Sequence, residues 1–462
     1  MNSVKGKRLH FIGVGGSGMS GIARIMLSAG AIVSGSDVKL NSVTENLQTL
    51  GARIVQGHSA ENIGDAELLI VSSAIDKKNP EIAAALEAGI PIISRAQALA
   101  LLMEGRRSIA VAGTHGKTTT TSMLTVALQS ASVDPSFAIG GMINSSGTNA
   151  YLGSGDIFVA EADESDGSFL VYKPLGAIIT NVELDHVDNF DTLEEIENLF
   201  LDFVNTIQPS GFLICCIDDS GVRELLSKVS RSDIQIITYG KIEANLTISR
   251  IVLEPHRSFS RITQNGVVLG ELALSVVGEH NILNAAAALA TGIALGVPAT
   301  ALMTGLASFT GSRRRFEFKG EVSGVTVIDD YGHHPTEIRV TLEAARRFAA
   351  PGRVIVLFQP HRYTRTQAFS AEFADALALA DEVILLEVYA ASEEPIPGVS
   401  SLRIAQAMNE NGYTSVMFEP SMLEAVDEMV KSARPGDLLL TMGAGDVSSL
   451  APVIVKALSE RE

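Results

Sequence analysis

Short apolar runs alternate with longer amphipathic stretches along most of the chain, and this pattern limits the possible folds more than any other feature. Residues 68–73 and 353–358 are apolar almost without a break, which is typical of strands buried on both faces of a parallel sheet. Residues 194–207 instead repeat apolar side chains at helical spacing. The alternation predicts an α/β protein built on parallel sheets.

Residues 245–277 depart from this pattern because they show no helical period. Gln264-Asn265-Gly266 separates two β-rich runs there, and an Asn-Gly pair in such a place is typical of a hairpin turn. The segment therefore predicts an antiparallel insert in the middle of the chain.

The length of 462 residues corresponds to about three domains of ~100–200 residues each. A strand, a glycine-rich loop and a helix follow one another near 8–27 and again near 108–128, and a third α/β run begins after the basic patch at 313–315. We place the domains at 1–106, 107–311 and 312–462.

The formal net charge is −18, from 35 basic and 53 acidic side chains. A nucleic-acid-binding protein needs a basic face to meet phosphates, so this balance argues against that class. An anionic small molecule is still compatible with the charge, because a few arginines or a helix N-terminus can bind it locally.

The two cysteines, Cys215 and Cys216, are adjacent within an apolar run. Neighbours in a strand point to opposite faces, so we expect buried thiols and no disulfide between them. A chain of this size without disulfides fits a reducing compartment, and we predict a cytoplasmic location. No signal peptide is visible at the N-terminus, and no run reaches the ~18 apolar residues of a membrane span, so no membrane insertion is expected.

Residues 13–18 read Gly-Val-Gly-Gly-Ser-Gly, after a predicted strand and before a predicted helix, with Asp37 further along. Glycines let the backbone approach a diphosphate, the helix N-terminus offers N–H groups, and Asp37 would accept hydrogen bonds from a sugar or base. A tight structural turn is the alternative, and the pattern does not separate NAD from a UDP-sugar. The candidate ligand residues are Gly15, Gly16, Ser17, Gly18, Met19 and Asp37, with Ser72 and Ser73 as strand-end contacts or ordinary turn residues.

A second loop, Gly113-Thr114-His115-Gly116-Lys117-Thr118 followed by Thr119, also joins a strand to a helix. It matches the end of a P-loop, although Val111 occupies the position of the first glycine. Backbone N–H groups would cradle phosphates, Lys117 would reach the β and γ oxygens, and Thr118 would offer a hydroxyl to Mg²⁺. The loop predicts nucleotide binding.

Two candidate metal ligands follow strands of the same predicted sheet, Glu161 after residues 156–160 and His186 after residues 176–180. Strand ends in an open parallel sheet form one crevice. A carboxylate and an imidazole there would suit a second divalent ion beside the nucleotide. Taken singly, each residue is better explained as an ordinary surface or hydrogen-bonded group, and it is their common placement beside the P-loop that favours the metal.

Asn281 and Asn284 lie at the head of an Ala-rich helix, three residues apart. They can read an adenine edge, but helix capping explains them better on chemistry alone. Further on, Arg and His gather in three segments that suggest anion handling, with a solvated basic patch as the alternative. These segments contain Arg313, Arg314 and Arg315; Asp330, Tyr331, His333 and His334; and His361, Arg362 and Arg365.

Taken together, these motifs resemble the Mur ligases of peptidoglycan synthesis. The matching segments are GVGGSGMSG, GTHGKTTTT, EADESD, NVELDHVD, GEHNILNAAAA, RRRFE, DDYGHHPTEI and FQPHRYTRT. The resemblance runs from residue 13 to about 366 by motif, and FQPHRYTRT is most similar to the alanine-adding branch.

The resemblance implies three domains: an N-terminal Rossmann-like UDP-binding domain, a central P-loop ATPase-type domain and a C-terminal Rossmann-like domain that closes on ATP and the substrates. It implies ATP and Mg²⁺ as cofactors, and UDP-N-acetylmuramate and L-alanine as substrates. ATP would phosphorylate the muramoyl carboxylate and the amine of alanine would attack the acyl-phosphate. We expect a monomer or weak homodimer, and no carbamylated lysine, because residues 193–207 contain no lysine.

The resemblance also assigns roles by motif. Lys117, Thr118, Glu161 and His186 would serve the phosphates and metals, Asn281 and Asn284 adenine, Arg315 the ATP site and Asp330 the ribose. Tyr331, His333, His361, Arg362 and Arg365 would lie where the third domain meets the UDP-sugar and the amino acid. The expected catalytic set is Lys117, Glu161, His186, Arg315 and His333.

Three rival functions remain open at this point. One is the family's ligase that attaches a recycled tripeptide to the same UDP-sugar. An NAD-dependent oxidoreductase would explain the first glycine loop but not GTHGKT. A UDP-sugar sensor without catalysis would leave every predicted ATP-site residue unexplained.

Overall fold

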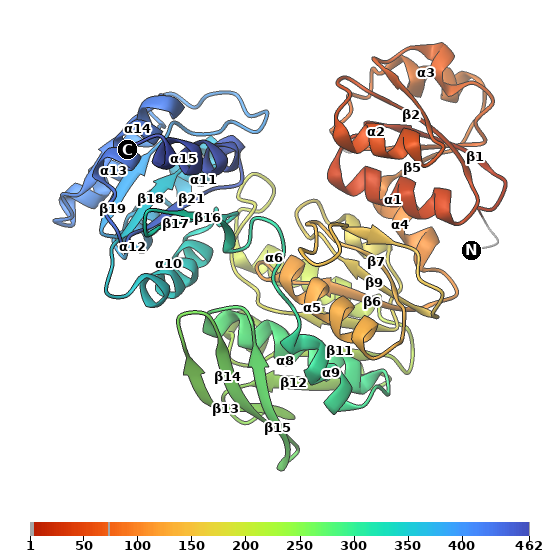
Figure 1. The fold of residues 1–462 in the computed structure, drawn as a ribbon. Coiled ribbons are helices and arrows are strands. Elements are labelled where there is room, and N and C mark those ends of the chain that lie inside the picture. The colour runs from red at the N-terminus through yellow and green to blue at the C-terminus, as the bar shows by residue number, and fades with distance from the viewer. Residues whose placement is uncertain (1–3, 73, 462) are drawn as a thin grey trace. The chain divides into compact units, whose positions relative to one another are not determined.

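The computed structural model describes residues 4–72 and 74–461, and it divides into two compact units. Unit 1 comprises the chain up to Val182 with Glu197–Leu246 and Ala285–Leu306, and unit 2 comprises Glu183–Ile196, Thr247–Asn284 and the chain from Ala307 onward. Unit 1 contains one parallel and one mostly parallel sheet, and each of them includes the strand that leads into one of the two glycine loops. Unit 2 contains a third, mostly parallel sheet with helices (Figure 1).

The first sheet has the strand order β3-β2-β1-β4-β5, with every pair parallel. Its strands are β1 (Arg8–Ile12), β2 (Ile32–Asp37), β3 (Arg53–Gln56), β4 (Leu68–Val71) and β5 (Ile92–Ser94). Its helices are α1 (Ser17–Ser28), α2 (Ser42–Thr49), α3 (Pro80–Glu87) and α4 (Arg95–Met103). The order reverses between β1 and β4, so the loops after these two strands border the crevice where open α/β sheets bind ligands.

The central sheet of unit 1 runs in the order β12-β11-β10-β6-β9-β7-β8, parallel except between β7 and β8. Its strands are β6 (Arg107–Ala112), β7 (Ser136–Ala138), β8 (Ala150–Tyr151), β9 (Ile157–Glu161), β10 (Gly176–Ile179), β11 (Phe212–Cys216) and β12 (Gln235–Gly240). Helices α5 (Lys117–Ser130) and α7 (Ser220–Lys228) belong to this unit, α6 (Leu193–Asn205) and α8 (Glu279–Ala294) begin in unit 2 and end in unit 1, and α9 (Ala299–Ala307) follows. The second glycine loop leads from β6, in the middle of the sheet, into α5.

The predicted antiparallel insert is confirmed. It consists of β13 (Leu246–Leu253), β14 (Ser258–Gln264) and β15 (Val267–Leu274), and β14 pairs antiparallel with β15. The turn residues Asn265 and Gly266 have φ of 47° and 83°. Positive φ at both positions is the type I′ turn that the Asn-Gly pair predicted.

The sheet of unit 2 has the order β16-β17-β21-β18-β19-β20, parallel except for β16. Its strands are β16 (Glu317–Val322), β17 (Val325–Asp330), β18 (Val354–Phe358), β19 (Glu382–Leu385), β20 (Val416–Phe418) and β21 (Leu438–Met442). Its helices are α10 (Pro335–Ala349), α11 (Tyr363–Ala368), α12 (Ser370–Leu377), α13 (Leu402–Glu410), α14 (Met422–Ser432) and α15 (Leu450–Ser459).

Both faces of this third sheet are covered, which explains the uninterrupted apolar run of β18. Val354, Val356 and Phe358 pack under α10, α12 and α13, whereas Ile355 and Leu357 pack under α14 and α15. Every second side chain points to the opposite face, so a strand buried on both faces needs apolar residues at each position.

The α/β class and the strand positions are therefore confirmed, as are the buried free thiols of Cys215 and Cys216. Across the described ranges, the structure contains no helix that is long and apolar enough to cross a membrane.

Candidate functional site

The first glycine loop connects β1 to α1, and the structure brings its predicted partner Asp37 against it. The Gly15 N–H donates to Asp37 Oδ2 over 2.8 Å. A Cβ on Gly15 would lie only 2.9 Å from that oxygen, so this close approach requires glycine. In this structure the Asp37 carboxylate supports the loop itself.

The other first-loop candidates differ in what they can offer a ligand. Gly16 is the N-cap of α1 and Ser17 and Gly18 begin the helix, so their backbone N–H groups are at the N-terminus. The Met19 side chain is 2% exposed and belongs to the core, which leaves only its backbone for a ligand. Ser72 follows β4, beside Gly13. Ser73 lies outside the described residues.

The second glycine loop is held in shape by the end of the neighbouring strand β10. The Thr180 hydroxyl donates to the His115 carbonyl over 2.6 Å, and the His115 N–H donates to Asn181 Oδ1 over 2.8 Å. Gly113 has a φ of 128°, and a Cβ there would collide with Thr180 Oγ1 at 2.0 Å. Thr180 and Asn181, which lie outside the motif, therefore fix the conformation of the loop Gly113–Gly116 that precedes Lys117.

Lys117, the first residue of α5, is the central cation of this loop. Its Nζ donates to Glu164 Oε1 over 2.8 Å and to the carbonyls of Gly113 and Thr114 over 2.7 and 3.0 Å. Burial lowers the pKa of Lys117, but the carboxylates of Glu164, Asp163 and Glu161 outweigh it, and the net pKa is raised. The ammonium stays charged, and all three of its protons have acceptors within the chain.

Thr118 and Glu161 form the oxygen-rich side of the same loop. The Thr118 hydroxyl donates to Glu161 Oε1 over 3.0 Å, and Glu161 Oε2 accepts the Gly140 N–H over 2.7 Å. A hydroxyl and a carboxylate at this spacing are donors that a hard divalent cation prefers, so these residues fit Mg²⁺. Thr119 follows in the first turn of α5 and is partly exposed.

His186, the third predicted metal ligand, belongs to unit 2, whereas Thr118 and Glu161 belong to unit 1. It has a φ of 52°, and its Nε2 lies 3.9 Å from Asp185 Oδ2. The predicted metal set is thus divided between the two units, and its completion stays a prediction.

Asn281 and Asn284 lie in the first turns of α8, as predicted. The Asn281 side-chain amide donates to the Val277 carbonyl, four residues earlier, over 2.7 Å. Both side chains are largely buried, at 9% and 8% exposed. Asn281 is the third residue of α8 and donates to a carbonyl, whereas an N-cap side chain accepts a backbone N–H, so the structure does not show it as a cap. Adenine recognition remains a prediction for both residues.

Asp330, at the end of β17, organises the turn that carries Arg315. Its Oδ2 accepts the Phe316 N–H over 2.8 Å and its Oδ1 accepts the Gly332 N–H over 2.7 Å. Burial raises the pKa of Asp330, against the lowering effect of Arg315 and of these two donors. Arg315 lies over the Tyr331 ring at 5.1 Å and 3.4 Å from Glu337 Oε1.

Two histidines of the third α/β region face each other in unit 2. The rings of His333 and His361 are 5.9 Å apart, and His361 stacks on Tyr389 at 5.6 Å. Burial lowers the pKa of His333 to about 3, although Glu337 opposes the shift, and burial together with Arg365 lowers the pKa of His361 to about 4. Both imidazoles are neutral at pH 7 and can accept a hydrogen bond.

Arg362 and Arg365 are already paired with acidic residues that follow β10. Arg365 is 4% exposed and donates to Asp185 Oδ1 from Nε and Nη2 over 3.0 and 2.7 Å, and Arg362 pairs with Asp188. Burial disfavours the charge of Asp185, but Arg365 and the neighbouring histidines hold the pKa of its carboxyl far below the usual range. Both arginines therefore have carboxylate partners within unit 2 in this structure.

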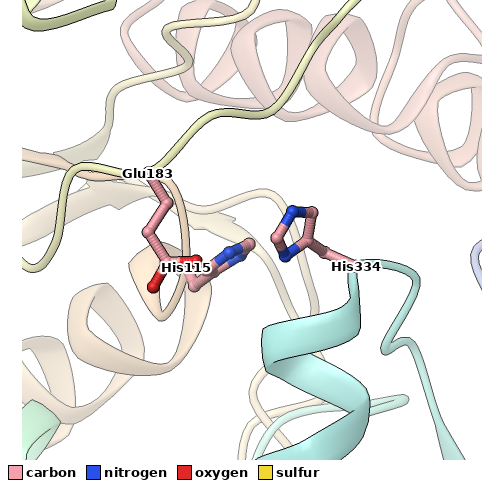
Figure 2. Close-up of side chains that lie close together, drawn as sticks. All are labelled: His115, Glu183 and His334. Atoms are coloured by element: carbon pink, nitrogen blue, oxygen red, sulfur yellow. The ribbon is translucent and has the colours of Figure 1, made fainter. Parts of the chain in front are cut away.

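Another side chain after β10, Glu183, lies beside α10 in the same unit. Glu183 Oε2 accepts the Thr336 hydroxyl over 2.7 Å, and His334 is the N-cap of α10 (Figure 2). Figure 2 also labels His115, which belongs to the second glycine loop of unit 1.

Sequence reasoning missed several acidic residues that the structure places at these sites. Glu164 and Asp185 lay within the quoted motifs but were not singled out, because a single acidic residue inside a motif has no distinguishing pattern. The signal that could have found them is charge matching, since a buried lysine or arginine needs an anionic partner.

Comparison with known proteins covers nearly the whole chain. Three family models match, described as "Mur ligase family, catalytic domain" over residues 8–107, "Mur ligase middle domain" over 111–292 and "Mur ligase, glutamate ligase domain" over 314–445. The UDP-N-acetylmuramate--L-alanine ligase of Acidothermus cellulolyticus is 49% identical, with 98% of this chain and 95% of that protein covered. The protein of the same name from Saccharopolyspora erythraea is 49% identical, with 99% and 94% covered.

Solved structures agree with this assignment. The UDP-N-acetylmuramate-alanine ligase of Thermotoga maritima superposes with a TM-score of 0.83 at 30% identity, covering 98% of this chain and all of that chain. A murein peptide ligase from Psychrobacter arcticus gives a TM-score of 0.73 at 26% identity, with 98% and 99% covered. On the three matched models and these relatives, this chain belongs to the Mur ligase family.

Proposed function

We propose that this chain joins L-alanine to the carboxylate of UDP-N-acetylmuramate at the expense of ATP, in the synthesis of peptidoglycan precursors. The observation that carries the proposal is the presence in one unit of two glycine-rich loops, each joining the carboxyl end of a parallel strand to a helix N-terminus, a place suited to phosphate binding. The names of relatives at 49% identity support the choice of both substrates.

The chemistry requires activation because a carboxylate is a poor acceptor for an amine. The γ-phosphoryl group of ATP converts one carboxylate oxygen into a leaving group, and ADP departs. The alanine amine then attacks the acyl carbon, loses a proton, and inorganic phosphate leaves as the amide forms. Lys117 would stabilise the negative charge that builds up on the transferred phosphoryl oxygens.

We assign Mg²⁺ to Thr118, Glu161 and His186. The hydroxyl of Thr118 and the carboxylate of Glu161 are 3.0 Å apart, which suits a shared hard cation. When bound, Mg²⁺ neutralises phosphate charge and favours phosphoryl transfer. The role of His186 rests on the family motif.

The remaining assignments follow the family motifs. ATP would contact Gly113, Thr114, His115, Gly116, Lys117, Thr118, Thr119, Asn281, Asn284, Arg315 and Asp330. The UDP-sugar would contact Gly15, Gly16, Ser17, Gly18, Met19, Asp37, Ser72, Ser73, His361, Arg362 and Arg365. His333, neutral at pH 7 and next to His361, would act in catalysis. Arg362 and Arg365 would have to exchange a carboxylate partner for substrate.

We further propose domain boundaries at 1–106, 107–311 and 312–462, a monomer or weak homodimer, and a cytoplasmic location. The unpaired thiols of Cys215 and Cys216 fit a reducing compartment.

The deciding measurement is phosphate release from ATP and Mg²⁺, with UDP-N-acetylmuramate and L-alanine added singly and then together. Release only when both are present is the expected result. Release with a tripeptide but not with alanine would assign the chain to the recycling ligases instead. An absorbance change of NAD with the UDP-sugar, without phosphate release, would favour the oxidoreductase.

Lys117→Ala should abolish this release, with a loss of about a hundredfold or more, because no other side chain of the loop carries a positive charge to the phosphates. Lys173→Ala, which removes an exposed lysine from the same unit, is the matched control and should retain activity. Equal activity of both variants would refute the assigned role of Lys117.

A further inference from the structure

Arg95, the first residue of α4, lies directly against the first glycine loop. A Cβ on Gly18 would be 3.1 Å from Arg95 Cδ and 3.3 Å from Arg95 Nη1. Both residues belong to unit 1, and the Arg95 side chain is 27% exposed. A guanidinium therefore stands at the N-terminus of α1, where the sequence predicts a diphosphate.

This position is electrostatically unfavourable for a cation without a ligand. The N-terminus of a helix carries partial positive charge, and Arg95 stands at the N-termini of both α1 and α4. Neither helix has an acidic residue in its first turn, and the N-cap Gly16 offers no side-chain acceptor. The acidic side chain that pairs with Arg95 here is Asp163.

The partner that Arg95 has in this structure is weakly held. Asp163 Oδ2 lies 3.7 Å from Arg95 Nη2, beyond hydrogen-bond distance, and the Asp163 side chain is 46% exposed. An ion pair of this kind contributes little free energy, so an incoming anion can replace Asp163 at low cost.

We infer that Arg95 binds the diphosphate of the UDP-sugar, exchanging Asp163 for phosphate oxygens while the N–H groups of α1 hold the other side of the ligand. This inference rests on the proposed function and adds a residue to its substrate site. A guanidinium presents a planar set of N–H donors that match phosphate oxygens in pairs, and Gly18 leaves room for that approach. No bond is made or broken by this residue.

Isothermal titration with UDP in the absence of ATP tests the contact. Arg95→Gln should weaken UDP binding about tenfold or more, because it removes a charged hydrogen-bonding group. Arg95→Lys should recover part of the loss, since it restores the charge without the paired donors. Arg8→Gln, at the opposite end of β1 and paired with Asp65, should bind UDP like the unaltered chain.

In steady-state assays, Arg95→Gln should raise the KM for UDP-N-acetylmuramate and leave the KM for ATP unchanged. Unaltered UDP affinity in a folded Arg95→Gln protein would overturn the inference, as would a loss confined to kcat. Should Arg95→Gln not fold, Arg95→Lys decides alone, and unchanged UDP affinity there overturns the inference. If the unaltered chain itself does not bind UDP, the proposed function fails together with this inference.

Discussion

At the scale of single residues, the hydrogen bonds of Lys117 determine whether the second glycine loop can bind a nucleotide phosphate. An ammonium group has three protons, and Glu164, Gly113 and Thr114 accept all three in this structure. Lys117 therefore cannot reach a nucleotide phosphate without giving up a partner. Of these three partners only Glu164 is charged, and its side chain is only 2% exposed. The Glu164 carboxylate and the nucleotide phosphate would therefore compete for the Lys117 ammonium.

Glu164→Gln should destabilise the ligand-free protein, because a buried ammonium loses the charge of its partner. A non-hydrolysable ATP analogue should then raise the Tm more in Glu164→Gln than in the unaltered chain, since the phosphate replaces a lost charge. Thermal unfolding with and without the analogue measures both effects.

Glu87→Gln is the matched control, because Glu87 is exposed at the end of α3. It should change neither the Tm nor the shift caused by the analogue. Equal shifts in Glu164→Gln and the unaltered chain would show that Glu164 does not compete with the nucleotide.

At the scale of elements, the hairpin of β14 and β15 shows how two residues fix the register of strands. Asn265 and Gly266 both have positive φ, which matches the right-handed twist of the flanking strands. The turn fixes the pairing of Gln264 with Val267, and an irregularity between Ile262 and Thr263 shifts the register of the strands beyond it. In the resulting register Ile262 and Leu272 lie in the core while Val267 is exposed.

Gly266→Ala should destabilise this hairpin by about 1 kcal/mol, since a Cβ disfavours a φ of 83°. Amide hydrogen exchange in β14 and β15 should speed up, whereas β17 and β18 should be unaffected. Gln264→Ala, on a strand residue next to the turn, is the control and should change exchange less. Unchanged protection in Gly266→Ala would mean that strand packing alone sets the register.

At the scale of the whole molecule, the two units respond to acid through different groups. Unit 2 contains His280, His333 and His361, whose pKa values burial lowers to about 4, 3 and 4. Unit 1 contains Glu81. Burial disfavours its charge, but the nearby His10 ring and hydrogen bonds from Ser36 and Asn62 lower its pKa to about 2.

Acid lowers the stability of both units, but it does so over a different pH range for the histidines of unit 2 than for Glu81 of unit 1. A histidine with a lowered pKa binds protons more tightly when unfolded, so stability is lost as pH falls from about 6.5 towards 4. Glu81 stabilises the fold above its ordinary pKa of 4.5, and this contribution is lost between pH 4.5 and about 2. Unit 2 should therefore begin to lose stability at a higher pH than unit 1.

Urea unfolding followed by circular dichroism at pH 7.5, 6, 5 and 4 should resolve this difference as two transitions that separate on acidification. Glu81→Gln should lower the stability of unit 1 near neutral pH and flatten its dependence below pH 4.5. A single transition with one midpoint at every pH would contradict independent unfolding of the units.

The sequence by itself determined the α/β class, the strands of the sheet interiors, the hairpin turn and both glycine loops. Each of these depends on local chemistry: continuous apolar runs, an Asn-Gly pair, or glycines between a strand and a helix. The short strands β7, β8 and β20 were not predicted, because two or three residues carry no periodic signal.

Only the tertiary structure determined which charged side chains pair with one another and which loop each of them contacts. Glu164 reaches Lys117 across 47 residues, Asp185 reaches Arg365 across 180, and Arg95 lies against Gly18. These pairings depend on strand order and on the direction of each loop, which no local pattern encodes. Motifs therefore identify the residues that bear the chemistry, whereas the partners that hold each charge in place follow from the fold.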